Sequence, residues 1–174
     1  MRYNQIREID ISNGEGVGVA LFVQGCPSPH CKNCFNPETW NFNGGKEWTT
    51  KIEDKFFELI DKPYIKRISL LGGECLAQQN VVEVTRLAKK CKEEFHQKKI
   101  WLWSRYDFEK YISYLEITKY VDYIIDGEFI EKLKDISLLY RGSSNQQIWK
   151  KENEKWHNVT KILDKCGSVM KNDR

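Results

Sequence analysis

Short apolar runs that end on glycine or polar residues recur along the chain. Their length and their content of β-branched and aromatic residues suit buried strands, which read as nearly continuous hydrophobic segments. Four such runs predict strands: GVALFVQ at 18–24, IKRISLL at 65–71, KIWLW at 99–103 and YVDYIID at 120–126. The first run ends just before a cysteine-rich loop, and the second closes on two glycines.

Amphipathic segments between these runs predict helices. Apolar positions recur at helical spacing in residues 52–60 and stop near Pro63, and a second helix is expected to begin at Asn80 as its cap. A third is predicted from the segment 107–115. Alternating strands and helices favour an α/β fold with a parallel sheet, whose chemistry collects beyond the carboxyl ends of the strands. The last fifty residues are less regular, and we expect a single domain over residues 1–174.

Composition narrows the class of protein. Apolar residues make up 40% and charged residues 30% of the 174 residues, as in a folded globular domain. The net charge of +3, from 28 basic and 25 acidic residues, gives no support for nucleic-acid binding. No apolar stretch has the length of a membrane span, and the opening residues, MRYNQIREID, lack the apolar core of a signal peptide. We therefore expect a cytoplasmic protein without a membrane partner.

Three of the six cysteines form a compact motif. Cys26, Cys31 and Cys34 lie in GCPSPHCKNCFNPETW with C-x4-C-x2-C spacing. The cytosol keeps thiols reduced, so these cysteines are expected to be metal ligands and not disulfide partners. Three thiolates leave one coordination position open, which suits either a catalytic iron-sulfur cluster or zinc.

The alternative to a cluster is a zinc site completed by another residue. His30, His157 or a distant cysteine would have to supply the fourth ligand of a closed zinc site. A second metal-binding pair is missing from the sequence, because the remaining cysteines are scattered at Cys75, Cys91 and Cys166. Spacing alone leaves the choice of metal open.

Polar residues and glycines follow the predicted strands. Gly72 and Gly73 would let a ligand approach the backbone, and Glu74 could accept hydrogen bonds from a cationic amino group, although a paired glycine is also ordinary turn chemistry. Ser104 could bind a ribose hydroxyl or cap a helix. Arg141 could bind an anion or pair with a carboxylate, the alternative being a surface salt bridge.

Taken together, these pieces resemble the radical S-adenosylmethionine (SAM) activating enzymes, specifically the activators of anaerobic (class III) ribonucleoside-triphosphate reductase. The likeness runs from about residue 18 to 148 through FVQGC, CKNCFNPETW, LLGGE, WLWSRYDFE, VDYIIDGEFIEKLKD and LLYRGSSNQQI. Two departures stand out. The family pattern has three residues between its first two cysteines where this chain has four, and Cys75 stands where a proline is usual.

The resemblance implies an incomplete β/α barrel of the radical SAM type, with parallel strands and outer helices. It implies that three irons of one 4Fe-4S cluster are bound by protein thiolates, while the fourth binds the amino and carboxylate groups of SAM. The implied cluster ligands are Cys26, Cys31 and Cys34. Asn33 and Phe35 would lie near the adenine, and the methionine end would be lined by Gly72, Gly73 and Glu74.

By the same resemblance, a flavodoxin-like donor reduces the cluster, and SAM is cleaved to methionine and a 5′-deoxyadenosyl radical. That radical would take hydrogen from a backbone glycine of the anaerobic ribonucleoside-triphosphate reductase, so no side-chain general base is needed. One alternative is another small radical SAM enzyme, which activates a different glycyl radical enzyme or acts on a deazapurine-type small molecule. A second alternative is a non-enzymatic zinc or iron-sulfur module that mediates protein contacts.

Overall fold

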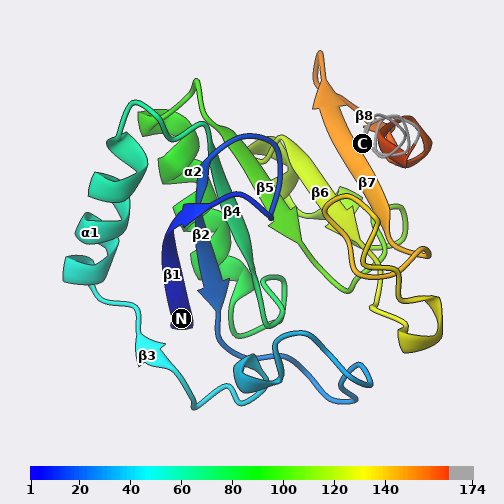
Figure 1. The fold of residues 1–174 in the computed structure, drawn as a ribbon. Helices are drawn as coiled ribbons and strands as arrows, with labels where there is room; N and C mark the ends of the chain where they lie inside the picture. Colours follow the sequence, from blue (N-terminus) through cyan, green and yellow to red (C-terminus); the bar gives the residue numbers. More distant parts are fainter. Residues whose placement is uncertain (165–174) are drawn as a thin grey trace.

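The computed structural model describes residues 1–164, which form a mixed α/β structure around one sheet (Figure 1). Its strands are β1 (Arg2–Asp10), β2 (Gly18–Val23), β3 (Lys46–Glu47), β4 (Arg67–Gly72), β5 (Lys99–Trp103), β6 (Tyr123–Asp126), β7 (Gln147–Glu152) and β8 (Lys155–Asn158). Its α-helices are α1 (Thr50–Asp61) and α2 (Val81–Glu94). Short 3-10 turns are η1 (Pro37–Thr39), η2 (Ile112–Tyr114), η3 (Glu116–Lys119) and η4 (Glu131–Leu133).

The sheet is open, with strand order β3-β1-β2-β4-β5-β6-β7-β8. Its centre is parallel, because β2, β4, β5 and β6 pair in the same direction. The outer strands β1, β3, β7 and β8 are antiparallel to their neighbours. The four strands expected from the sequence are therefore confirmed as the parallel core, and the segments after β2 and β6 lie toward the same edge (Figure 1).

The two faces of the sheet bury different sets of side chains, since successive residues of a strand point to opposite faces. Val19, Leu21 and Val23 of β2 pack in one apolar cluster with Phe56 of α1 and Leu87 of α2. This is the helix-covered face and the main core. Buried residues of the opposite face include Ala20, Phe22, Leu71, Trp101 and Ile125.

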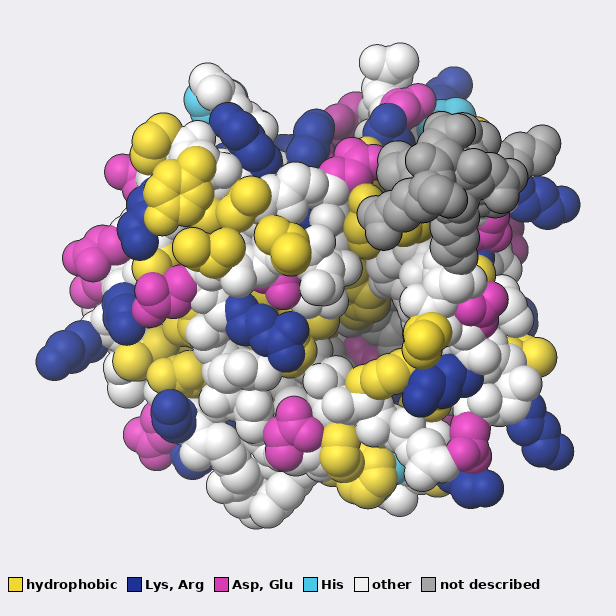
Figure 2. Space-filling view, in the orientation of Figure 1, with side chains coloured by type: hydrophobic (Ala, Val, Ile, Leu, Met, Phe, Trp, Pro, Cys, Tyr) yellow, Lys and Arg dark blue, Asp and Glu magenta, His cyan; other side chains and the backbone are white. Residues whose placement is uncertain are grey.

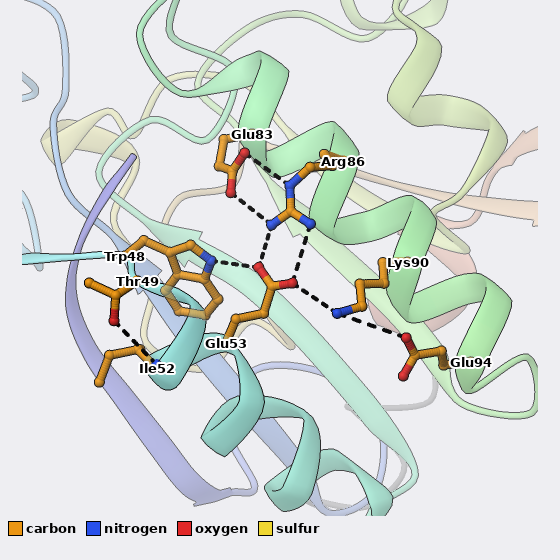
Figure 3. A network of polar contacts seen from close by, with 8 residues as sticks. All are labelled: Trp48, Thr49, Ile52, Glu53, Glu83, Arg86, Lys90 and Glu94. Atoms are coloured by element: carbon orange, nitrogen blue, oxygen red, sulfur yellow. Dashed lines mark hydrogen bonds and ion pairs between the residues drawn. The ribbon is translucent and has the colours of Figure 1, made fainter.

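A buried carboxylate joins the two helices (Figure 3). Glu53 of α1 accepts hydrogen bonds from Trp48 Nε1 and Lys90 Nζ, both at 3.0 Å, and from the guanidinium of Arg86 in α2. Burial disfavours the charged form, but the bonds from these three side chains lower the pKa of Glu53 to about 2. Glu53 is therefore ionised and fully engaged at neutral pH.

Glu53→Gln is expected to lower the free energy of unfolding at pH 7 by about 2 kcal/mol, because hydrogen bonds to a buried charge are lost. The folded-state pKa lies below the ordinary value of 4.5, so this contribution is present above pH 4.5 and is lost as the pH falls toward about 2. Urea denaturation at pH 7 and at lower pH measures it. The exposed Glu58→Gln serves as control, and a difference from wild type that is independent of pH would contradict the prediction.

The helix predicted over residues 107–115 is wrong. Turns occupy residues 108–111 and η2 occupies Ile112–Tyr114, and η3 follows the segment. The backbone N–H of Phe108 donates to Asp126 Oδ2 at 2.7 Å, and its ring packs against Trp149 and Trp156. These contacts with distant residues override the local helical pattern.

Three further features were not anticipated. β1 is a mostly polar strand beside β2, and β7 and β8 form a hairpin in the region expected to be irregular. Its two-residue turn places Asn153 and Glu154 at positive φ, as hairpin turns of this length require. Asn80 precedes α2 as expected but does not cap it, since its amide donates to Gln24 O and Glu74 O at 3.0 Å. Within the described residues, neither α-helix has the length and apolarity needed to cross a membrane.

Candidate active site

A cavity of about 570 Å³ lies at the carboxyl ends of β2, β4 and β5. The face drawn in Figure 2 is hollowed near its centre, with hydrophobic side chains inside the hollow. The predicted site residues that line the cavity are Cys26, Cys31, Cys34, Phe35, Gly72, Gly73, Glu74 and Ser104. Asn33 is the exception. The strand ends therefore bring together side chains from three separate stretches of sequence, as expected for parallel strands.

Backbone hydrogen bonds fix the start of the cysteine loop (residues 26–34), which follows the end of β2. Gly25 N donates to Thr39 O at 2.7 Å and Cys26 N donates to Trp40 O at 3.0 Å. Gly25 O accepts from Glu74 N at 2.8 Å, which ties the start of the loop to the turn after β4. The first cysteine is thus placed by the ends of two parallel strands.

The three thiols share one cavity and are partly buried. Burial raises the pKa of the Cys26 thiol to about 11, and the nearby Glu74 carboxylate adds to the rise. Burial also raises the pKa of Cys31, with a further contribution from Glu128. A metal must displace these protons on binding. Three soft donors facing one cavity fit a 4Fe-4S cluster that keeps one iron free for another ligand.

The two histidines considered as zinc ligands do not line the cavity. The His30 ring stacks on Trp40 with centroids 4.2 Å apart, and its Nε2 lies 3.0 Å from Cys26 O. His157 lies in β8, opposite Lys150 of β7. In the part of the chain that the structure describes, no three of the His, Cys, Asp and Glu residues are grouped to hold a single metal ion.

Cys75 and Cys91 do not line the cavity. Cys75 and Cys91 are buried in the main apolar core, and burial raises the pKa of both thiols. Cys75, directly after Glu74, is therefore a small packing residue of the core. Cys166 lies outside the described residues.

Glu74 connects the ends of β4 and β5. It is 1% exposed, and its Oε1 accepts from Leu76 N at 2.9 Å and from Ser104 Oγ at 2.8 Å. Its Oε2 accepts from Arg105 N at 2.8 Å. Burial raises the pKa of this carboxyl despite the three hydrogen bonds. Ser104 Oγ also accepts from Tyr106 N at 3.1 Å, and it starts no α-helix, so Ser104 lines the cavity and is not a helix cap.

Gly72 and Gly73 lie where the turn after β4 comes so close to the backbone at the end of β2 that a side chain would clash. A Cβ on Gly73 would lie 2.4 Å from Gly25 O, and a Cβ on Gly72 would lie 2.7 Å from Val23 N. Gly72 also has φ +117°, which favours glycine. The packing of the turn after β4 against the end of β2 is therefore sufficient to require glycine at both positions, independently of any ligand.

The two residues expected near the adenine behave differently. Phe35 is 53% exposed at the cavity, with its ring centroid 5.0 Å from that of Phe129. Asn33 is exposed at positive φ, and its amide donates to Glu131 outside the cavity lining. Its proposed contact with adenine stays a prediction.

Arg141 lines the cavity and pairs with the carboxylate of Asp164 at 2.7 Å. Pairing with a carboxylate is confirmed, but the surface location is wrong, because Arg141 is only 7% exposed. Two charged residues were missed altogether. Arg105 follows Ser104 at the end of β5 and lines the cavity, and Glu128 follows β6 and bonds to Arg105 at 2.7 Å. The signal available in the sequence was their position directly after predicted strands.

Comparison with known proteins gives a consistent picture. A family model described as a 4Fe-4S single cluster domain matches residues 12–149. The chain is 40% identical over 156 residues to the anaerobic ribonucleoside-triphosphate reductase-activating protein of Enterobacteria phage T4, covering 90% of this chain and 98% of the relative. The proteins of the same name from Escherichia coli (strain K12) and Vibrio cholerae are 37% and 38% identical over 151 residues, covering 85% of this chain and 97% of each relative.

Proposed function

The chain belongs to the family of the anaerobic ribonucleoside-triphosphate reductase-activating proteins, and from that premise we propose that it generates the glycyl radical of such a reductase. Membership makes it an enzyme, a radical SAM activase with a 4Fe-4S domain. The proposal adds the chemistry, which is reductive cleavage of SAM at the cluster. The observation that carries it is the convergence of three thiols and the Gly-Gly-Glu turn on one cavity.

The proposed cluster ligands are Cys26, Cys31 and Cys34. Their support is the donor set, since three thiolates at one cavity leave one iron of a four-iron cluster for another ligand. When both are bound, the reduced cluster would supply an electron that cleaves a sulfonium bond of SAM. The products are methionine and a 5′-deoxyadenosyl radical, and the radical takes hydrogen from glycine. The protein has to bind and orient these groups and exclude competing hydrogen donors.

The remaining proposed roles concern SAM. Glu74 and the backbone at Gly72 and Gly73 would bind the methionine amino end, and Ser104 would contact the ribose. Within the described residues, Glu74 Oε2 accepts a hydrogen bond from Arg105 N alone. A carboxylate oxygen can accept two, so Oε2 can accept another from an ammonium group. Phe35 offers an exposed ring for the adenine, and Asn33 is proposed beside it.

The proposed macromolecular partner is the reductase, with a flavodoxin-like protein as electron donor. Apolar side chains at the cavity support the first part: Ile136 is 87% exposed and Phe35 is 53% exposed, and Leu138 lines the cavity with them. Exposed apolar patches of this kind mark interaction sites. An opening with apolar margins suits entry of a glycine-bearing loop.

We propose that residues 1–174 act as one radical SAM domain with a partial β/α barrel. Its support is the parallel run β2-β4-β5-β6 with α1 and α2 packed on one face, within a single sheet. The two other functions considered from the sequence, a different radical SAM reaction and a metal-binding module, are not favoured, because relatives along most of the chain carry the activating-protein name.

The proposal is tested by anaerobic reconstitution of the purified protein with iron and sulfide, followed by dithionite and SAM. Chromatography should detect 5′-deoxyadenosine, and addition of the reductase encoded by the same genome should give a glycyl radical signal in electron paramagnetic resonance (EPR) spectra. Product without a glycyl radical would point to another substrate. No product from a correctly loaded cluster, with or without the reductase, would contradict the proposed chemistry.

A further inference from the structure

One guanidinium holds the first half of the cysteine loop. Arg105 Nη1 donates to Pro27 O at 2.9 Å and to Pro29 O at 2.7 Å, both between Cys26 and Cys31. Its Nη2 donates to Glu128 Oε1 at 2.7 Å, and its side chain is only 16% exposed. A rigid fork of donors is well suited to bind two carbonyls at once.

The loop has few other restraints. Residues 27–35 make no backbone-to-backbone hydrogen bond with another described residue, and two of the four residues between Cys26 and Cys31 are prolines without an N–H. The ends of this half of the loop are held by Cys26 N, which donates to Trp40 O at 3.0 Å, and by Cys31 Sγ, 3.6 Å from Glu128 Oε1. Between them, His30 Nε2 lies 3.0 Å from Cys26 O within the loop itself. Arg105 therefore supplies the main attachment of this segment to the sheet.

The same guanidinium lies in a group of charges around the thiols. Glu128 Oε1, which accepts from Arg105, also lies 3.6 Å from Cys31 Sγ. A carboxylate this close to a metal-bound thiolate repels the negative charge that reduction adds to a cluster, whereas Arg105 attracts it. The two side chains therefore act on cluster reduction in opposite directions.

We propose that Arg105 is a positioning residue for the iron-sulfur cluster: it fixes the cysteine loop through Pro27 O and Pro29 O and, opposed by Glu128, sets the reduction potential. This inference rests on the proposed function for the presence of a cluster. Arg105 also lies within hydrogen-bonding reach of the Cys26 thiol, but it contacts no reacting atom, so it acts through the loop and through its charge.

Three variants of the full chain separate these contributions. Arg105→Gln removes the charge and the fork, Arg105→Lys keeps the charge and loses the fork, and Glu128→Gln removes the opposing charge. Lys110→Ala is the matched control, because Lys110 is a cation five residues away whose side chain is 85% exposed in a surface ion pair. Thermal unfolding of each metal-free protein checks that the variants fold.

Iron content after gel filtration and EPR-monitored redox titration, both without SAM or partner, give the readouts. We expect Arg105→Gln to retain less than about half of the wild-type iron and to be about tenfold harder to reduce, which corresponds to about 59 mV for a one-electron couple. Arg105→Lys should lose iron but keep a potential near wild type. Glu128→Gln should shift the potential upward by a comparable amount.

Equal iron content and equal potentials in Arg105→Gln, Glu128→Gln and Lys110→Ala would overturn the inference while leaving the proposed function intact. A shift of the same sign in Arg105→Gln and Glu128→Gln would overturn the electrostatic part. A wild-type protein that binds no iron under anaerobic reconstitution would overturn the proposed function and, with it, this inference. If Arg105→Gln does not fold, the iron content of Arg105→Lys still tests the fixing of the loop, and the reduction potential of Glu128→Gln still tests the electrostatic part.

Discussion

Cys31→Ala is expected to abolish cleavage of SAM, with 5′-deoxyadenosine falling at least about a thousandfold below wild type under anaerobic reducing conditions. The three thiols at the cavity are the proposed protein ligands of the cluster, and two thiolates hold it far less well than three. Glu128 lies 3.6 Å from Cys31 Sγ, but a carboxylate is a poor substitute for a soft thiolate. Iron content and product formation should therefore be lost together.

Cys91→Ala is the matched control for this prediction. Cys91 is buried in α2 within the main core and does not line the cavity, so its loss removes packing only. This variant should bind iron and cleave SAM like wild type, with a lower free energy of unfolding by about 1 kcal/mol. Full activity in Cys31→Ala would show that the ligands are misassigned, and equal losses in both variants would point to unfolding.

The parallel core of the fold was predictable because each of its strands is buried on both faces. Such strands read as continuous apolar runs, and Lys99–Trp103 was predicted with the bounds that the structure has. The carboxyl ends of β2, β4 and β5 then bring cysteines, glycines and Ser104 to one cavity, although they are far apart in sequence. The rule that parallel strands end at the same edge of a sheet, combined with the predicted strand positions, was sufficient to predict this part of the site.

The outer strands were not predictable in the same way. β1 reads RYNQIREID, and its burial is mixed because a side strand of an open sheet keeps polar residues. The hairpin turn uses Asn153 and Glu154 at positive φ instead of the asparagine–glycine pair that marks such turns. The segment 107–115 has helical periodicity, yet Asp126 and two tryptophans of the hairpin hold Phe108 in a turn.

The parts of the site that escaped prediction depend on contacts between distant residues. Glu74 was expected to face a ligand, and the structure shows that three of its acceptor positions already serve Leu76, Ser104 and Arg105. Arg105 and Glu128 meet only because the ends of β5 and β6 are neighbours. Residue type and spacing identify candidate ligands, but the partners that hold them are set by the folded sheet.

Gly73→Ala is expected to disrupt the cluster site without altering any of the three proposed cluster ligands. The added methyl would lie 2.4 Å from Gly25 O and 2.8 Å from Gly25 C, and Gly25 immediately precedes Cys26. Backbone atoms cannot move aside as a flexible side chain can, so the end of β2 must shift, at a cost of about 3 kcal/mol. For a domain of this size that corresponds to a fall in the melting temperature of roughly 6–12 °C.

The shift should also displace the first cysteine, because the bond from Glu74 N to Gly25 O is made at the same point. Iron retention and SAM cleavage are therefore expected to fall at least about tenfold even at temperatures where the variant is folded. Gly127→Ala is the control: it also lines the cavity and has φ +95°, but its added Cβ has no neighbour closer than 3.6 Å. That variant should lose about 1 kcal/mol of stability and keep its iron. If both variants lose iron equally, backbone strain anywhere around the cavity is enough to release the cluster, and the contact between Gly73 and Gly25 has no special role in placing Cys26.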